Sequence, residues 1–136
     1  MTRINANIPP KELTRMHLVA ELREITMVPA SLKRSLRTKT MNEVLKSIPA
    51  QFTLNAGHVK FFYSRLHFLK DRFDALCEEM RNRGYEPDVS RKVAFDNFPK
   101  EFYNHWAATE RDNDIVRERI AVRISQKPHL YMDFIK

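Results

Sequence analysis

The longest apolar pattern in the chain lies between residues 56 and 83 and has the period of an α-helix. Six large apolar residues recur there every three or four positions: Phe62, Leu66, Leu69, Phe73, Leu76 and Met80. This spacing places them on one helix face, which must pack against other elements. We expect a helix that begins near Ala56 or Gly57, runs to about Arg83 and builds the main core. Gly84 is suited to end it, and Cys77 beside the stripe is expected to be a packing residue.

A first helix is expected from about Lys11, with a core stripe of Leu18, Leu22 and Ile25. Pro29 should kink or end this helix, because proline lacks the backbone N–H that the helix interior needs. A short helical continuation is expected over residues 30–36. Residues 38–55 are mixed in composition and rich in turn-forming residues, so we expect no helix there.

A third helix is expected from about Thr109 to Gln126, stopped by Pro128, with Ile115, Ile120 and Ile124 facing inward. Residues 85–107 should form a long loop whose aromatic residues pin it to the core. The chain has only two glycines and no long alternation of apolar and polar residues, which disfavours a sheet. We therefore predict an all-α fold: one domain over residues 1–136, with three principal helices and long irregular connections.

The net charge of +7 and pI of about 9.8 favour an anionic partner, most commonly nucleic acid. A basic surface that serves only solubility is the alternative. Cys77 is the single cysteine, so no internal disulfide can form and an intracellular, cytoplasmic protein is expected. The sequence shows no signal peptide and no stretch apolar enough to span a membrane, so no membrane partner is expected.

A polar constellation lies on the first expected helix. His17, Glu21 and Glu24 fall within an arc of about 60°, and the core stripe is centred roughly 110° away. These side chains could line a groove beside the core, whereas Arg23 projects to another side, where it could reach a phosphate. An ordinary solvated helix face is the alternative. His17 and Glu21 could also ligate a metal, but no second histidine lies nearby, so we expect no metal.

The first residues offer an unusual nucleophile. Thr2 is small, so we expect the initiator methionine to be removed and the α-amine of Thr2 to be freed. The reference pKa of an α-amine is about 7.7–8.0, against about 10.4 for lysine, so it is far more available as the uncharged amine near neutrality. Such an amine can attack an electrophilic carbon and form a Schiff base.

Four segments together resemble the pyrimidine dimer DNA glycosylase family, the endonuclease V of phages and large DNA viruses. They occur in the order of the family, at nearly its spacing, and span most of the chain. The segments are residues 2–5 (TRIN), 17–24 (HLVAELRE), 52–63 (FTLNAGHVKFFY) and 119–128 (RIAVRISQKP).

The resemblance implies a DNA repair enzyme that acts without a cofactor as a monomer on damaged double-stranded DNA. It would combine N-glycosylase and abasic-site lyase activities on cyclobutane pyrimidine dimers. The α-amine of Thr2 would attack C1′ of the deoxyribose and form an imine, and Glu24 would stabilise the cationic transition state and assist proton removal. His17 would orient groups in the pocket, and Glu21 would add to its electrostatics. The DNA-binding positions that the resemblance implies are Arg3, Arg23, Arg119, Arg123, Lys127 and Tyr131.

The sequence departs from the family pattern mainly at its end. Met16 and Met27 replace polar or basic residues of some members, and only Tyr131 survives from an aromatic tail, with Phe134 as a conservative change. The tail contributes to lesion recognition in the family, so dimer discrimination is expected to be weaker here. Two alternatives stay open: a lyase for abasic or oxidised sites without dimer preference, and a basic DNA-binding protein without catalysis.

Overall fold

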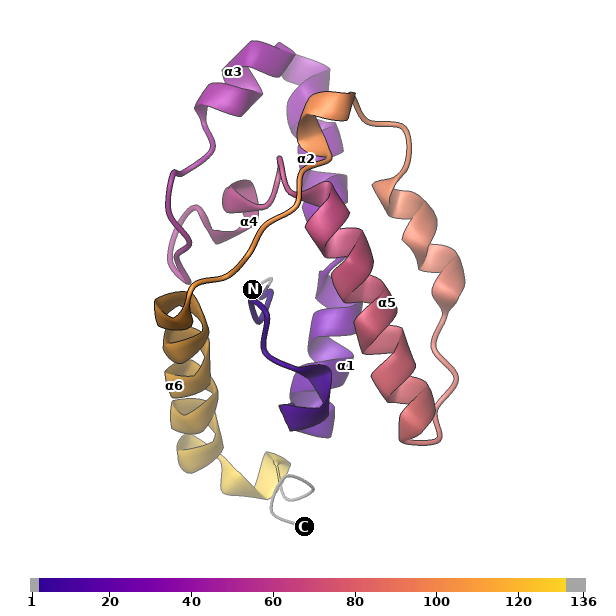
Figure 1. The fold of residues 1–136 in the computed structure, drawn as a ribbon, viewed down its shortest axis with the longest axis vertical. Coiled ribbons are helices and arrows are strands. Elements are labelled where there is room, and N and C mark those ends of the chain that lie inside the picture. The colour runs from indigo at the N-terminus through magenta and orange to yellow at the C-terminus, as the bar shows by residue number, and fades with distance from the viewer. Residues whose placement is uncertain (1–2, 132–136) are drawn as a thin grey trace.

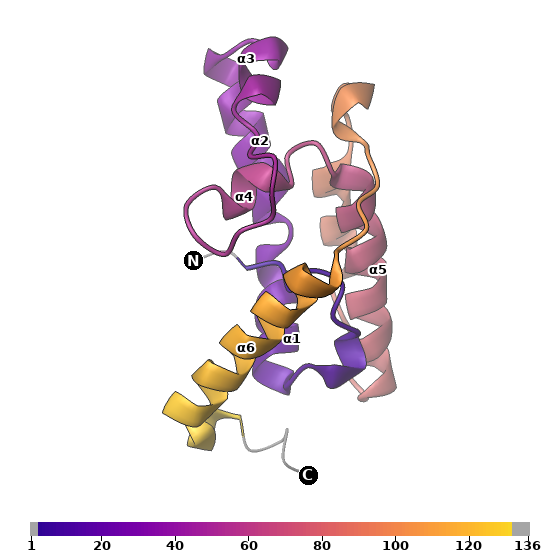
Figure 2. The same ribbon diagram turned by 60° about the vertical axis from the view of Figure 1, so that its left-hand side comes forward.

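The computed structural model describes residues 3–131, and all the regular structure in this range is helical (Figures 1 and 2). This confirms the predicted all-α class. Thr2 and Phe134 lie outside the described residues. The α-helices are α1 (Arg15–Glu24), α2 (Met27–Thr38), α3 (Met41–Lys46), α4 (His58–Phe61), α5 (Leu66–Asn82) and α6 (Glu110–Gln126). Four short 3₁₀ segments accompany them: η1 (Pro10–Glu12), η2 (Val89–Phe95), η3 (Lys100–Phe102) and η4 (Pro128–Leu130).

The first expected helix is in fact two helices. It does not begin at Lys11, because η1 ends before Thr14, whose hydroxyl accepts a hydrogen bond from the backbone N–H of His17 and caps α1. Pro29 neither kinks nor ends a helix. It lies in the first turn of α2, where proline is tolerated because the N–H groups there have no partner within the helix. Residues 30–36 form the middle of α2.

The second expected helix is also divided, into α4 and α5. Gly57, with φ of +97°, precedes α4, and Gly84, with φ of +90°, follows α5 as expected. The apolar stripe along α5 is buried, and Cys77 packs in it with only 2% of its surface exposed. Burial raises the pKa of the Cys77 thiol, in keeping with the predicted packing role.

Sequence reasoning missed α3 in the turn-rich region. Thr40 and Glu43 form a reciprocal capping box at its start, in which each side chain accepts a hydrogen bond from the backbone N–H of the other. The prediction for residues 85–107 holds better. Phe95 and Phe102 are fully buried and fix this long connection, including η2 and η3, against the core.

Helix α6 has the predicted bounds but is less buried than predicted. Val116 is its one fully buried apolar residue, whereas the three isoleucines expected to face inward are only partly buried, and of these Ile120 packs against the core. The physical reason is the position of α6, which lies at one side of the molecule (Figures 1 and 2). It faces α1 across the N-terminal segment instead of entering a bundle.

The N-terminal segment, residues 3–8, runs through the interior between the helices (Figure 1). We call it the N-terminal arm. Ile4, Ala6 and Ile8 are almost completely buried, and Ala6 adopts a positive φ of 48° in a turn closed by a hydrogen bond from the Ile8 N–H to the Asn5 carbonyl. The arm is therefore part of the core, and its conformation is set by the helices around it.

Candidate functional site

A cavity of about 200 Å³ opens where the N-terminal arm, α1 and the C-terminal segment meet. We call it the central pocket. The arm contributes two residues, α1 contributes four, and α6 with the residue after η4 contributes four. Its lining comprises Arg3, Asn5, His17, Ala20, Glu21, Glu24, Arg119, Ile120, Arg123 and Tyr131.

Seven of the residues singled out from the sequence therefore lie around one cavity, although they come from three distant parts of the chain. Arg23 and Lys127 do not line it and are exposed at the surface. Arg23 was expected to project to another side, and its carbonyl accepts a hydrogen bond from Arg91 at 2.8 Å. The position of Thr2, outside the described residues, adjoins Arg3 in the chain.

The central pocket concentrates positive charge. The pKa of Arg3 is lowered by burial and then by the nearby charges of Arg119 and Arg123, and it is raised by Glu24. Three guanidinium groups thus lie close enough to repel one another. Such repulsion is relieved when an anion binds between them, and arginine suits phosphate because its planar group donates two parallel hydrogen bonds.

Glu24 ends α1 at the edge of this basic cluster. Burial raises the pKa of its carboxyl above the ordinary value, and the positive charges of Arg23 and Arg3 oppose the shift. A carboxylate with an elevated pKa is better able to exchange a proton near neutral pH. Glu24 is therefore the carboxyl group in the pocket best suited to acid–base or electrostatic work.

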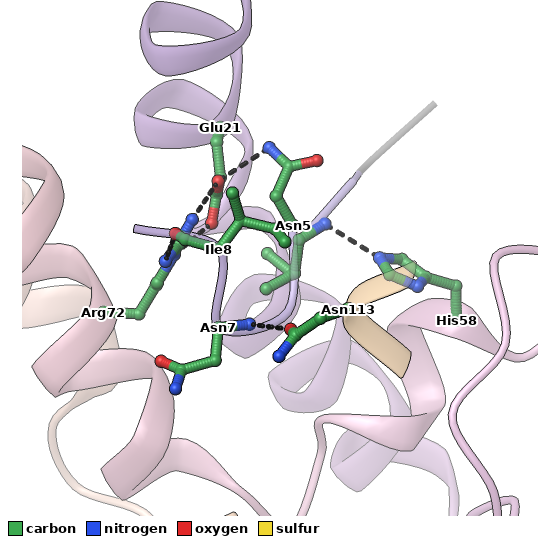
Figure 3. A network of polar contacts seen from close by, with 8 residues as sticks. Asn5, Asn7, Ile8, Glu21, His58, Arg72 and Asn113 are labelled. Carbon is green, nitrogen blue, oxygen red and sulfur yellow. Dashed lines mark hydrogen bonds and ion pairs between the residues drawn. The ribbon is translucent and has the colours of Figure 1, made fainter. Parts of the chain in front are cut away.

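Glu21 has a different environment from the one expected. It is 1% exposed, and its two oxygens accept hydrogen bonds from Arg72 Nε at 2.7 Å and Nη2 at 2.9 Å (Figure 3). Asn5 Nδ2 donates a third at 2.7 Å. Glu21 lines the pocket, as expected from the sequence, but its burial was not expected. Its charge is neutralised by Arg72, and with both oxygens occupied it is a poor candidate for the metal ligand considered above.

His17 lies at another wall of the pocket. Its Nδ1 is 2.8 Å from the Thr14 hydroxyl, and its ring stacks on Tyr131 with centroids 4.8 Å apart and an angle of 13° between the planes. The hydrogen bond fixes the ring at the start of α1. The stacking brings the residue after η4 to the pocket, which places the one retained tail aromatic beside Glu24 and the arginines.

The N-terminal arm is held at both sides by side chains from distant helices. The Ile4 N–H donates to His58 Nε2 at 2.8 Å, and the Asn7 N–H donates to Asn113 Oδ1 at 3.1 Å (Figure 3). His58 Nδ1 in turn donates to the carbonyl of Thr53 at 2.8 Å, so the ring is in its neutral Nδ1–H form. Burial lowers the pKa of His58 to about 4, which keeps Nε2 free to accept.

These positioning residues were missed by the sequence analysis. Arg72 offered a signal, because a charged residue within the apolar stripe of α5 needs a buried partner. His58 lies in a segment that was noted only as a resemblance. Asn5 and Asn113 carry no pattern that distinguishes them from exposed asparagines, since their role depends on contacts over 16 and 106 residues of sequence.

A wider groove of about 960 Å³ also borders Arg3, away from Glu24. Arg34 from α2 and Lys60 from α4 line it together with Ser31 and Tyr63, whose hydroxyls are 2.6 Å apart. Arg3 thus lies between the central pocket and this groove. Basic residues therefore line both cavities, with Arg3 common to the two.

A family model described as pyrimidine dimer DNA glycosylase matches residues 1–93. The match covers more than half of the chain, from the arm through α5 and into η2, and the chain belongs to this family of DNA repair glycosylases. It includes His17, Glu21 and Glu24 and stops before α6. Among residues 3–131, no helix has the length and apolar character needed to cross a membrane.

Proposed function

We propose that this protein is a DNA N-glycosylase with abasic-site lyase activity, acting on cyclobutane pyrimidine dimers in duplex DNA. The observation that carries the proposal is the central pocket itself. It sets the first described residue of the arm, Arg3, beside a half-buried carboxylate and two further arginines. The proposed nucleophile, the α-amine of Thr2, precedes Arg3 by one residue in the sequence, and consecutive Cα atoms are about 3.8 Å apart.

In the proposed reaction, the nitrogen of the Thr2 α-amine forms a bond to C1′ of the deoxyribose. The N-glycosidic bond breaks, and the base leaves with its electron pair and takes up a proton. The amine then loses a proton, and its nitrogen lone pair forms a double bond to C1′ as the C1′–O4′ bond breaks; O4′ takes up a proton, and the product is a protonated imine. Removal of the C2′ proton breaks the C3′–O bond, and the 3′ phosphate leaves with the electron pair by β-elimination. Water finally hydrolyses the imine, which frees the Thr2 amine and leaves an aldehyde on the sugar.

Glu24 has two roles in this scheme. As an anion it stabilises the positive charge that develops at C1′ when the base leaves. As a base it assists removal of the C2′ proton, a task helped by its elevated pKa. His17 positions the sugar or its phosphate, and Glu21 acts through Arg72 and Asn5 by fixing the arm. These steps need an amine and a carboxylate and no metal or cofactor.

The basic residues supply binding in this proposal. Arg3, Arg119 and Arg123 contact phosphates at the damaged site, while Arg23 and Lys127 contact phosphates farther along the duplex. Tyr131, stacked on His17, offers an aromatic face to an exposed base. Damaged pairs stack poorly and cost less to distort, so part of the selectivity comes from deformability. We propose that one copy of the chain is sufficient, since one chain supplies all three walls of the pocket.

The test is borohydride trapping on duplexes that carry an abasic site or a dimer. Borohydride reduces an imine to a stable amine, so the enzyme should become covalently joined to DNA. Thr2→Ala, with its amine free, should still be trapped, whereas a chain with one residue inserted before Thr2 should not. Glu24→Gln should bind the duplex normally but excise about 10²–10⁴-fold more slowly, since its charge acts in the transition state.

Each outcome is decisive for one part of the proposal. Mass spectrometry of the intact proteins must first show that Met1 has been removed. Absence of trapping by both the parent chain and Thr2→Ala would leave a DNA-binding protein without this catalysis. Normal abasic cleavage without any cleavage of dimers would favour the specialised lyase, an alternative motivated by the altered aromatic tail.

A further inference from the structure

A second group of chemically active side chains lies outside the central pocket, at the start of α5. His67 is in the first turn of that helix, Asp71 is one turn later, and His105 comes from the segment between η3 and α6. All three side chains are exposed, and one ligand atom from each lies within 4.8 Å of the others. None of the three residues lines the central pocket or the wider groove beside Arg3.

The geometry within this group is close to that of a metal site. His67 Nδ1 is 3.5 Å from Asp71 Oδ2, and the two imidazole rings have centroids 3.8 Å apart with an angle of 37° between them. Two ligands bound tetrahedrally to one zinc ion are about 3.3 Å apart, given bonds of about 2.0–2.1 Å. All three ligand atoms lie within 4.8 Å of one another, so binding an ion requires the exposed side chains to rotate and shorten the longer separations.

The backbone on both sides of His105 is fixed against α5. The carbonyl of Asn104 accepts a hydrogen bond from the Phe68 N–H at 3.3 Å, and Asn104 Nδ2 donates to the carbonyl of Ser64 at 2.8 Å. On the other side, the Trp106 ring packs edge-on against Phe68, with centroids 5.0 Å apart. His105 is therefore held opposite His67 by its neighbours, which lowers the entropy cost of binding an ion.

We propose that His67, Asp71 and His105 bind a zinc ion that clamps the segment before α6 to the start of α5. Two imidazoles and one carboxylate form a ligand set that zinc accepts, with water in the fourth position. The clamped segment leads into α6, which carries Arg119 and Arg123. The ion would thus stabilise the segment that positions α6 at the pocket, without taking part in catalysis. This proposal is independent of the proposed function.

The test is titration of the full, metal-free chain with ZnCl₂ by calorimetry, with MgCl₂ as the comparison. We expect one zinc per chain and no binding of magnesium, which prefers oxygen ligands. His67→Gln, Asp71→Asn and His105→Gln should each weaken zinc binding by on the order of 100-fold. Each removes a ligand, and loss of a residue that only supports a ligand already weakens metal binding by about 10–100-fold. The matched control is His129→Gln, an exposed histidine in η4 that should bind zinc as the parent does.

A second measurement tests the clamp. Hydrogen exchange of the amides in residues 104–108 should slow on addition of zinc in the parent and should not change in His105→Gln. The proposal is overturned if no stoichiometric binding is seen, or if His67→Gln and His105→Gln bind as the parent does. Zinc binding without slower exchange in residues 104–108 would refute the clamp.

Discussion

The buried imidazole of His58 joins the N-terminal arm to the loop before α4. Its Nε2 accepts a hydrogen bond from the Ile4 N–H, which requires this nitrogen to be unprotonated, and its Nδ1–H donates one to the Thr53 carbonyl. Burial, with a smaller contribution from the charge of Arg3, lowers its pKa to about 4, so protonation is resisted in the folded protein. The position of the arm, and with it the geometry of the pocket, therefore depends on the protonation state of this ring.

The pH dependence of stability follows from this shift. Above pH 6.5, the reference value for histidine, His58 is neutral in both states and the full stability is present. Between pH 6.5 and about 4, His58 binds a proton in the unfolded chain but stays neutral in the folded protein. The free energy of unfolding therefore falls as the pH falls. The loss at pH 4 should be about 3 kcal/mol.

Urea unfolding at several pH values measures this effect. The difference between the parent and His58→Gln should change over this pH range, because glutamine does not titrate, whereas His129→Gln should follow the parent. If the parent and His58→Gln lose stability in parallel, another group is responsible for the acid sensitivity.

At the scale of the residue, the sequence indicated which side chains share a cavity better than it indicated their hydrogen-bond partners. His17 and Glu24 were identified from their shared helix face and Arg3 from the family resemblance, and all three line one cavity. The burial of Glu21 was not predicted, because a helical wheel shows which side chains share a face but not what covers that face. Here the covering element is Arg72, which is 51 residues away in sequence.

At the scale of the element, α6 presents one face to the pocket and another to solvent. Arg119 and Arg123 are one turn apart and line the pocket, whereas Arg111 near the start of the helix is exposed and does not. The two pocket arginines also lie close to the charge of Arg3. We therefore expect α6 to bind phosphate mainly through this one face.

Arg119→Ala and Arg123→Ala should each weaken binding to damaged and undamaged duplex alike. Each should lower the slope of log K against log salt by about one, because one fewer counterion is released. Arg111→Ala is the control and should leave the slope unchanged. Fluorescence anisotropy with a labelled duplex over a range of NaCl concentrations measures this slope. An unchanged slope with altered lesion preference in Arg119→Ala would show that Arg119 contacts the lesion and not a phosphate.

The helices themselves were predicted unevenly. The bounds of α6 and the end of α5 followed from Pro128 and Gly84, which end helices for local reasons. The division between α1 and α2, and that between α4 and α5, could not be seen, because apolar periodicity continues across both breaks. Tertiary packing decides such breaks, and α3 was missed because its six residues carry too short a pattern.

At the scale of the whole molecule, the buried ion pair of Glu21 and Arg72 connects α1, α5 and the N-terminal arm. Arg72 also donates to the carbonyl of Ile8, and Glu21 accepts from Asn5, so one pair fixes the arm at two positions along it. Both side chains are almost completely desolvated. Removing one partner would leave an uncompensated charge in the interior.

Arg72→Met should therefore lower the free energy of unfolding by about 3–5 kcal/mol. The exposed pair of Arg117 and Glu12 provides the control, and Arg117→Met should cost less than about 1 kcal/mol. Denaturant titration of both variants makes the comparison. Equal losses would mean that the interior pair contributes no more than a surface pair.

The central location of the arm also has a consequence for synthesis. Residues 3–8 leave the ribosome before any of the groups that hold them, and the last of these, Asn113, follows the arm by 106 residues. The full set of contacts that hold the arm can therefore form only after Asn113 has left the ribosome. A nascent chain that ends before Asn113 contains Arg3, His17 and Glu24 but lacks Arg119 and Arg123, so the central pocket can be completed only after α6 has been synthesised.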